Sequence, residues 1–393
     1  MASLSRSLLF VVLLGLVSLL ADTTYEGARS ITGPFLGTLG ATGLVVGFVS
    51  GLGELVGYAL RLASGYLTDR TRRYWLLTFV GYTVNLLAVP LLALAGNWLL
   101  ASLLIVLERC GKAIRTPARD AMLSHATRTL GHGWGFGLHE AMDQVGAVLG
   151  PLLVFATLSW HHDYRMGFAV LLVPAVLALV VLSVARWQFP RPQELEAKTV
   201  TLHTRGFSPT YWVYLSAVGL VAAGYADFPL MAYHYEKQGV VASSHIALLY
   251  ALAMGADAVG ALLLGRLFDK VGFATLALAT LISAGFAPLA FLGGFTGAVA
   301  GATLWGIGMS AQESVMRAAV AQLVPIERRG TGFGVFHTGY GVAWFAGSAL
   351  MGWLYDRSVL ALVVFSVCLQ AAALVVFLLL ARQYDGRRRL SPS

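Results

Sequence analysis

The stretch "SGYLTDRTRR", residues 64–73, decides the fold, because the chain carries a second, degraded copy of it. The copy is "LGRLFDKVGF", residues 264–273, in which a glycine is again followed four residues later by an aspartate and then by a base. The segments at 135–151 and 332–348 also match, "GFGLHEAMDQVGAVLGP" against "GFGVFHTGYGVAWFAGS". The two offsets are 200 and 197 residues. Two independent matches at nearly one offset indicate that the chain is a duplicated unit.

Composition places this duplicated unit in a membrane. Of the 393 residues, 58% are hydrophobic and only 12% are charged, whereas a soluble domain has about 25% charged residues. Apolar stretches recur along the chain, and each is long enough to cross a hydrocarbon core of about 30 Å. Cys110 and Cys368 stand in different apolar stretches, so neither a disulfide framework nor a Cys-rich metal site is indicated. We predict an all-α membrane protein.

The polar segment at 189–208, rich in proline and charge, is the only long linker in the sequence. It divides the chain into an N-terminal bundle at 1–188 and a C-terminal bundle at 209–393, two pseudo-symmetric halves of six helices. A signal peptide cut after Ala21 is the alternative to a first transmembrane helix. The twelve predicted transmembrane helices are at 7–32, 41–64, 74–95, 98–119, 133–158, 166–188, 209–235, 243–266, 273–293, 296–322, 331–355 and 359–382.

Basic residues favour one side of the membrane under this twelve-helix topology. By the positive-inside rule that side is cytoplasmic, which puts both termini and the linker in the cytoplasm. The other side has only Arg165, Lys237 and Arg357 in or near its loops. The cytoplasmic set is Arg6, Arg70, Arg72, Arg73, Arg119, Arg128, Arg191, Lys198, Arg205, Arg266, Lys270, Arg328, Arg329 and Arg387 to Arg389.

Three motifs resemble those of the major facilitator superfamily. Gly65–Arg73, with its copy at Gly265–Gly272, is similar to the family signature between helices two and three. Gly146–Pro151 resembles the antiporter motif that is common in the family's exporters. Arg109 with Gly111 is similar to the fourth-helix motif, although the spacing is one or two residues short. The resemblance implies secondary transport, with one six-helix half rocking against the other.

The resemblance also implies a cytoplasmic gate. Asp69 would face the positive N-terminus of span eleven, near Gly330. Gly65 would let helices approach closely, and Gly146 and Gly150 share a helix face suited to close packing. Pro151 would kink or weaken span five. A basic loop that only fixes topology is the alternative. The expected gating residues are Gly65, Asp69, Arg70, Arg73, Asp120, Gly146, Gly150, Pro151 and Asp269.

Ionisable residues interrupt the apolar spans. Each costs about 2.5–3.5 kcal/mol at mid-membrane on insertion scales, and such residues usually face a partner or an aqueous cavity. Asp22, Glu26 and Arg29 are spaced four and three, so they form one helical stripe. The candidate substrate and proton-coupling residues are Asp22, Glu26, Arg29, Glu54, Arg61, Arg109, His139, Glu140, Asp143, Asp227, His234, Asp257 and Glu313.

Two interpretations of these charges stay open. One is that each acid neutralises a base, which fits Glu313 with Arg317 and Glu108 with Lys112. The other is that crowded acids of the first half, Asp22 among them, load and release a proton in each transport cycle. The two histidines among the candidates are more often structural than ligands, and a metal site stays unknown.

These observations predict a secondary active transporter of a small polar, zwitterionic or metal-chelate solute, first of all a proton-coupled exporter. A proton-coupled uptake symporter and a divalent metal exporter are alternatives within transport, and a non-transporting receptor or scaffold is the alternative from another class. The sequence has no P-loop, nucleophile elbow or HExxH motif, so we expect no enzyme. We expect no cofactor and no nucleic acid, and a monomer in a lipid bilayer, the bacterial inner membrane.

Overall fold

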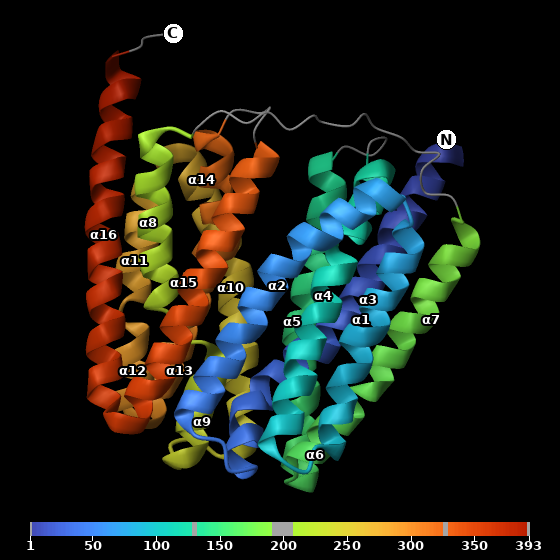
Figure 1. The fold of residues 1–393 in the computed structure, drawn as a ribbon, viewed down its shortest axis with the longest axis horizontal. Coiled ribbons are helices and arrows are strands. Elements are labelled where there is room, and N and C mark those ends of the chain that lie inside the picture. Colours follow the sequence, from blue (N-terminus) through green and yellow to red (C-terminus); the bar gives the residue numbers. More distant parts are fainter. Residues whose placement is uncertain (1, 128–131, 191–206, 325–328, 391–393) are drawn as a thin grey trace. The chain divides into compact units, whose positions relative to one another are not determined.

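The computed structural model describes residues 2–127, 132–190, 207–324 and 329–390. Every regular element in these ranges is a helix, as Figure 1 shows. The predicted all-α class is therefore confirmed. Within the described ranges, nine helical segments are long and apolar enough to cross a membrane.

The first six predicted spans are confirmed as helices, with one interruption. Helix α1 runs without a break through Asp22, as a transmembrane helix would. Span six breaks at Leu171, which lies between two helices and caps both. The helices are α1 (Ala2–Thr38), α2 (Gly43–Thr71), α3 (Tyr74–Leu91) with a short 3₁₀ turn η1 (Leu92–Leu94), α4 (Trp98–Thr127), α5 (His132–His161), α6 (Tyr164–Val170) and α7 (Leu172–Gln188).

The last six spans are more often broken. Span seven stops at Gly224 and restarts after Asp227, whose carboxylate accepts from the backbone N–H of Phe228. Span ten contains a π-helical turn, η3 (Ala311–Val315). The helices are α8 (Pro209–Ala223), α9 (Phe228–Lys237), α10 (Ser243–Val271), α11 (Ala274–Ser283), α12 (Phe286–Leu292), α13 (Gly294–Ser310), α14 (Met316–Leu323), α15 (Arg329–Arg357) and α16 (Val359–Leu390).

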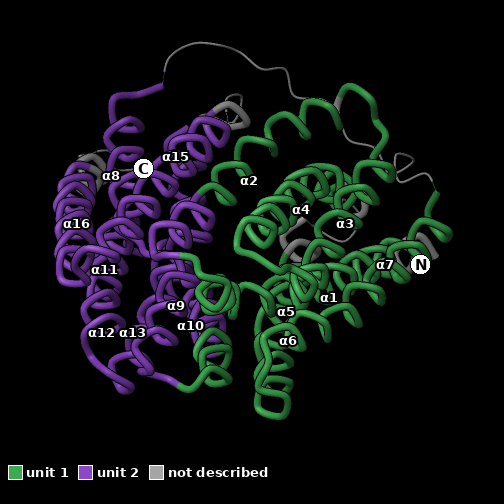
Figure 2. The backbone as a smooth tube through the Cα atoms, turned by 60° about the horizontal axis from the view of Figure 1, so that its bottom comes forward, with its two compact units in different colours: residues 1–41, 52–199, 242–251 green, residues 42–51, 200–241, 252–393 purple. Residues whose placement is uncertain are grey.

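The helices group into two compact units, coloured in Figure 2. Unit 1 comprises 1–41, 52–199 and 242–251, and unit 2 comprises the rest of the chain. The first turns of α2 thus group with unit 2, and the first turns of α10 with unit 1. The six-helix halves at 1–188 and 209–393 remain a prediction, since the two units follow contacts rather than the repeat.

Within unit 2, the start of α2 fits closely against the end of α15. The Asp356 carboxylate accepts from the backbone N–H of Gly43 and of Leu44, both at 2.8 Å. It therefore satisfies donors that a helix N-terminus leaves open. A Cβ at Gly47 would collide with the carbonyl of Ser348, so the two backbones approach as closely as glycine allows.

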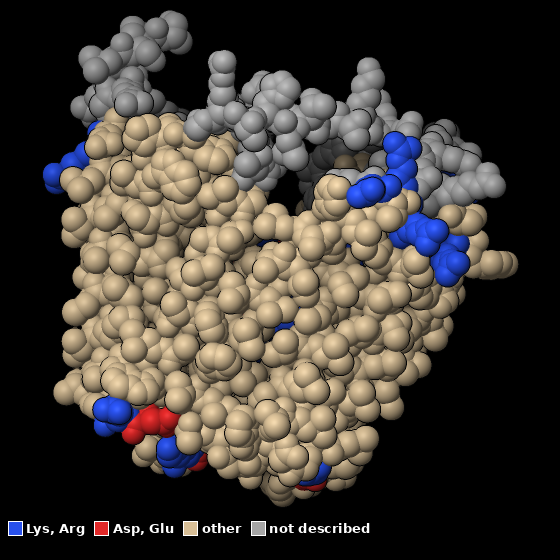
Figure 3. All heavy atoms as spheres, in the orientation of Figure 1, with Lys and Arg blue, Asp and Glu red and all other residues tan. Residues whose placement is uncertain are grey.

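Large apolar side chains are exposed on the outside of both units. Leu99, Val173 and Leu262 are each exposed by 60% or more. On the face drawn in Figure 3, uncharged atoms cover almost the whole middle of the surface. Such a surface suits lipid tails rather than water.

Candidate functional site

The α1 stripe is buried in unit 1, and its members have different partners. Asp22 and Glu26 are 7% and 8% exposed. Glu26 Oε2 accepts from the Tyr250 hydroxyl at 2.5 Å. Arg29 Nη2 lies 3.4 Å from Glu54 Oε1 of α2. Arg29 thus pairs with the second helix, while Glu26 contacts Tyr250 of α10.

Glu54 belongs to a chain of alternating charges. Besides Arg29, its Oε1 contacts Arg109 Nη2 at 3.3 Å. Arg109 Nε in turn lies 3.3 Å from Glu108 Oε2, and Asn85 Nδ2 donates to Glu108 Oε1 at 2.7 Å. Four helices contribute to this chain: α1, α2, α3 and α4. Its residues hold the helices together by matched charge.

One prediction about these charges is wrong. Glu108 pairs with Arg109 and Asn85, rather than with Lys112, which lies over the ring of Tyr25. The prediction assumed an i, i+4 pair, but the helix turns Lys112 toward α1.

Asp143 forms a second cluster on α5. Its Oδ2 lies 3.4 Å from His139 Nδ1 and 3.9 Å from Arg119 Nη1. Arg119 also contacts Asp120 at 2.8 Å and donates to Ser18 Oγ at 2.9 Å. Asp143 Oδ1 and His139 Nε2 are buried and have no hydrogen-bond partner among the described residues. The cluster therefore keeps one free acceptor and one free ring nitrogen.

Close packing of α1 on α5 brings Asp22 to this cluster. A Cβ at Gly146 would collide with the carbonyl of Leu19 and lie 3.0 Å from Asp22 Cβ. A Cβ at Gly150 would collide with the carbonyl of Thr23. The close packing predicted for Gly146 and Gly150 is thus confirmed. Asp22 lies within electrostatic range of Asp143, so two carboxyl groups share the buried interface.

Asp22 also faces two bases of α4 that the prediction left out of the site. It lies within electrostatic range of Lys112 and Arg115, while its Oδ1 has no hydrogen-bond partner among the described residues. Both cations stand over tyrosine rings, Lys112 at 3.9 Å from the centroid of Tyr25 and Arg115 at 4.3 Å from that of Tyr82. Their spacing of three along α4 was the only signal in the sequence.

Two further candidates of the first half are Arg61, which lies within electrostatic range of Glu54, and Glu140. Arg61 stands over the ring of Tyr58 at 5.3 Å, so its positive charge faces a π system. Glu140 is exposed, on a different face of α5 from the buried His139.

The second-half candidates lie at separate places in unit 2. Asp227 is the N-cap of α9, a structural role that the sequence interpretation missed. His234 Nδ1 lies 3.2 Å from the Tyr355 hydroxyl, against the ring of Phe291. Asp257 is buried within electrostatic range of Tyr225.

Glu313 lies in the π-helical turn and is exposed, as is Arg317. No ion pair joins these two side chains in the described part of unit 2. The predicted pairing is therefore wrong, because the π-helical turn changes the spacing on which an i, i+4 pair depends.

The predicted gate is described only in part. The nearest atom to a Cβ at Gly65 would be Pro117 Cβ at 3.8 Å, an ordinary contact, so the close approach predicted there is wrong. The side chain of Asp69 lies outside the described residues. Arg70 Nη1 donates to the Tyr66 hydroxyl at 3.4 Å.

Other gate residues have local roles. Asp120 pairs with its neighbour Arg119, and Asp269 is exposed. Arg73 is also exposed, just before α3. Helix α5 continues through Pro151.

No group of three His, Cys, Asp or Glu side chains that could hold a metal ion occurs within the described ranges.

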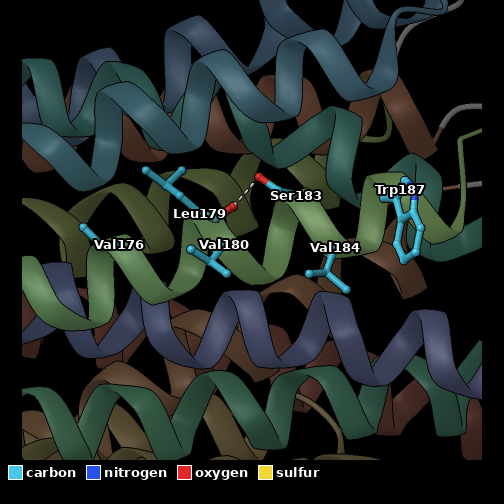
Figure 4. Close-up of a pocket in the computed structure, with 6 residues that line it drawn as sticks. All are labelled: Val176, Leu179, Val180, Ser183, Val184 and Trp187. Carbon is cyan, nitrogen blue, oxygen red and sulfur yellow. Dashed lines mark hydrogen bonds between the residues drawn. The ribbon is translucent and has the colours of Figure 1, made fainter.

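A groove on α7, drawn in Figure 4, is lined by Val176, Leu179, Val180, Ser183, Val184 and Trp187.

The groove on α7 is apolar. Its one hydroxyl, on Ser183, donates to the backbone carbonyl of Leu179 at 2.7 Å and is therefore satisfied. The groove suits a lipid tail and contains none of the candidate site residues.

Known proteins resemble this chain in sequence and in fold. The family model of the Major Facilitator Superfamily matches residues 11–300 and 214–393. The uncharacterized protein Rv2265 of Mycobacterium tuberculosis (strain ATCC 25618 / H37Rv) is 43% identical over 374 residues, 93% of this chain and 91% of the relative. The MFS-type transporter MJ1317 of Methanocaldococcus jannaschii is 27% identical and covers 88% of this chain and 89% of its own.

Two shorter sequence matches and one structure of similar fold are also found. The multidrug resistance protein MdtH of Proteus mirabilis is 31% identical over 30% of each chain. The benzoate transport protein of Acinetobacter baylyi is 29% identical over 45% of this chain and 35% of its own. A crystal structure of the peptide transporter POT superposes with a TM-score of 0.77 at 15% identity, covering 98% of this chain and 96% of that one.

Proposed function

This chain belongs to the major facilitator superfamily, and on that premise we propose that it is a proton-coupled secondary transporter of a small polar solute. Members of this family are transporters and not enzymes, so the chain is an integral membrane protein without a catalytic site. The proposed coupling groups are Asp22 on α1 and the pair of Asp143 and His139 on α5.

One observation carries the coupling proposal. Asp22 and Asp143 lie within electrostatic range of one another, and each has a buried carboxylate oxygen with no hydrogen-bond partner among the described residues. Two carboxyl groups that share a buried site can hold one proton between them, since both cannot readily be charged. His139 Nδ1, 3.4 Å from Asp143, offers a second proton-binding atom.

The matched chain around Glu54 is suited to a different task. Glu54 and Glu108 each contact a guanidinium group at 3.3 Å. Glu54 lies between the guanidinium groups of Arg29 and Arg109, and both contacts are strongest with a charged carboxylate. We therefore assign this chain to holding the helices together while the α1–α5 interface binds and releases the proton.

Export is the direction that we propose first. It rests on the resemblance of Gly146–Pro151 to the antiporter motif and on the partial match to the multidrug resistance protein MdtH. Proton-coupled uptake is the second candidate. It is favoured by the half-buried Lys112 and the buried Arg115, which have no ion pair among the described residues, because a proton carried inward together with an anion moves no net charge.

A flux assay in proteoliposomes tests the coupling and the direction. Compounds that raise the melting temperature of the purified chain are radiolabelled, and their flux is followed with an inward, an outward or no pH gradient. We expect the gradient to drive accumulation, in a direction that identifies antiport or symport. Equal flux under all three conditions would contradict proton coupling. Empty liposomes are the control.

A further inference from the structure

We infer that Lys112 and Arg115, with the rings of Tyr25 and Tyr82, form the binding site for the carboxylate of an organic-anion substrate. The inference rests on the transport function proposed above and names the class of solute. It goes beyond the coupling groups, which are acids on α1 and α5, to two bases on α4.

Arg115 is the first observation. Its side chain is 1% exposed, yet Nε and Nη1 are buried without a hydrogen-bond partner among the described residues. The guanidinium lies 4.3 Å from the centroid of the Tyr82 ring and 5.8 Å from that of Tyr25. A ring face attracts the charge but accepts few of the five N–H donors that a guanidinium carries. The edge of the guanidinium stays available to an acceptor.

Lys112 is the second observation. Its ammonium lies 3.9 Å from the centroid of the Tyr25 ring, the same ring that Arg115 approaches. The two cations are three residues apart on α4 and therefore project from neighbouring positions of one helix face. In the described part of unit 1, Lys112 makes neither an ion pair nor a side-chain hydrogen bond. Two unpaired positive charges thus meet around one aromatic ring.

Other buried bases of unit 1 differ in this respect. Arg29 and Arg109 both contact Glu54, and Arg119 contacts Asp120 at 2.8 Å. A buried cation that contributes only to stability would be expected to have such a partner, because an uncompensated buried charge is costly. Asp22 lies within electrostatic range of both cations, Glu26 and Glu108 of Lys112, and Asp143 of Arg115. No ion pair within 4.0 Å joins either cation to an acid in the described part of unit 1.

Helix packing fixes the two cations where they are. A Cβ at Gly81 of α3 would lie 2.5 Å from the backbone nitrogen of Arg115. A Cβ at Gly111 would collide with the backbone of Asn85. The α3–α4 contact is therefore as close as glycine allows, and the guanidinium has little freedom to seek another partner. The site is rigid before a ligand arrives, which lowers the entropy cost of binding.

The chemistry of the pair selects a carboxylate. A planar guanidinium presents two parallel N–H donors, which match the two oxygens of a carboxylate. The ammonium adds a second positive charge at the same ring. A neutral solute would leave the Nε and Nη1 donors of Arg115 without a charged acceptor. Inorganic oxyanions share the acceptor chemistry, so the test has to separate them from organic acids.

Binding to the purified full-length chain in detergent tests the inference without any gradient. The probes are sodium acetate, sodium benzoate and sodium succinate, with benzamide as a neutral analogue and sodium sulfate as an inorganic oxyanion. We expect a saturable rise in melting temperature with at least one carboxylate and none with benzamide. Arg115→Gln and Lys112→Gln should each weaken that binding at least tenfold.

The control variant is Arg186→Gln, which removes an exposed cation that stands over the ring of Phe79 at 5.4 Å. It should bind the carboxylate as the natural chain does. The ligand-free melting temperature of Arg115→Gln should stay level or rise, because buried guanidinium donors without an acceptor are removed. If Arg115→Gln does not fold, Lys112→Gln alone decides.

Three outcomes would overturn the inference: no carboxylate binds, benzamide or sulfate binds as well as the carboxylates, or both variants keep full affinity. These outcomes are independent of proton coupling. A chain that binds benzoate but shows the same flux with and without a pH gradient would contradict the proposed function and leave the carboxylate site intact.

Discussion

At the scale of single residues, the buried charges of unit 1 divide into satisfied and unsatisfied groups. Glu54, Arg109 and Glu108 are all matched by contacts of 3.3 Å. Asp22 and Asp143 each keep an oxygen without a partner among the described residues. Protonation of Glu54 would weaken two guanidinium contacts, whereas an acid with an open buried oxygen can take a proton there without breaking a hydrogen bond. The first group suits stability and the second suits transport.

Neutralising Glu54 should therefore destabilise the chain. Glu54→Gln removes the negative charge that Arg29 and Arg109 contact. We expect a loss larger than the roughly 1 kcal/mol of an exposed ion pair and below the roughly 3–5 kcal/mol of a fully buried one. The melting temperature in detergent measures it.

The matched variants are Asp22→Asn and Glu313→Gln. Asp22→Asn should keep or raise the melting temperature, and the exposed Glu313 should tolerate the change within about 0.5 kcal/mol. A melting temperature of Glu54→Gln equal to that of Glu313→Gln would contradict the division into two groups.

At the scale of helices, the glycines of α5 set the distance between α1 and the coupling cluster. A Cβ at Gly146 would collide with Leu19 of α1, whereas a Cβ at Gly57 of α2 would meet nothing within 4 Å. Glycine is therefore required at position 146 because no larger side chain fits there. At position 57 no neighbouring atom excludes a larger side chain. Alanine substitutions at Gly146 and Gly57 therefore separate the effect of helix packing from that of helix propensity.

Gly146→Ala should push α1 away from α5. We expect destabilisation of about 1–3 kcal/mol from overpacking, with loss of gradient-driven flux because Asp22 moves from Asp143. Gly57→Ala should instead gain up to about 1 kcal/mol from helix propensity. Thermal melting and flux of both variants check this. Equal melting temperatures of the two variants would show that α1 and α5 can separate without cost.

The sequence predicted the helices better than their interruptions and contacts. Twelve apolar stretches could be recognised in the sequence. The stretch that forms α4 was among them, although its charged residues exclude it from the helices apolar enough to count as candidate spans. The break before Asp227 was not visible, because an acid inside an apolar run resembles a functional site as much as a cap. Arg115 was missed for a similar reason: only the fold shows that its guanidinium lies over the rings of Tyr82 and Tyr25.

At the scale of the whole molecule, the duplicated sequence and the compact units describe different divisions. The repeat follows the covalent chain, while the units exchange the first turns of α2 and α10. Helix ends group by packing, as the bond between Asp356 and the N-terminus of α2 illustrates. No sequence period reports such a contact, since it joins residues 313 positions apart.

Orientation in the membrane is the whole-molecule prediction. From the basic residues we expect both termini and the 189–208 linker in the cytoplasm. In a chain whose own cysteines are replaced, a membrane-impermeant maleimide added outside intact cells should label His162→Cys and Gly239→Cys. It should not label Glu194→Cys until the cells are opened. Labelling of Glu194→Cys in intact cells would reverse the orientation.

The most direct test of the central claim compares two kinds of flux in Asp143→Asn. Without a titratable carboxyl group at this position, the chain should still exchange labelled for unlabelled substrate across the membrane, but a pH gradient should no longer drive accumulation. Glu140→Gln, an exposed acid on the same helix, should keep both activities. Full gradient-driven accumulation by Asp143→Asn would contradict the account, because the proton would then be carried elsewhere.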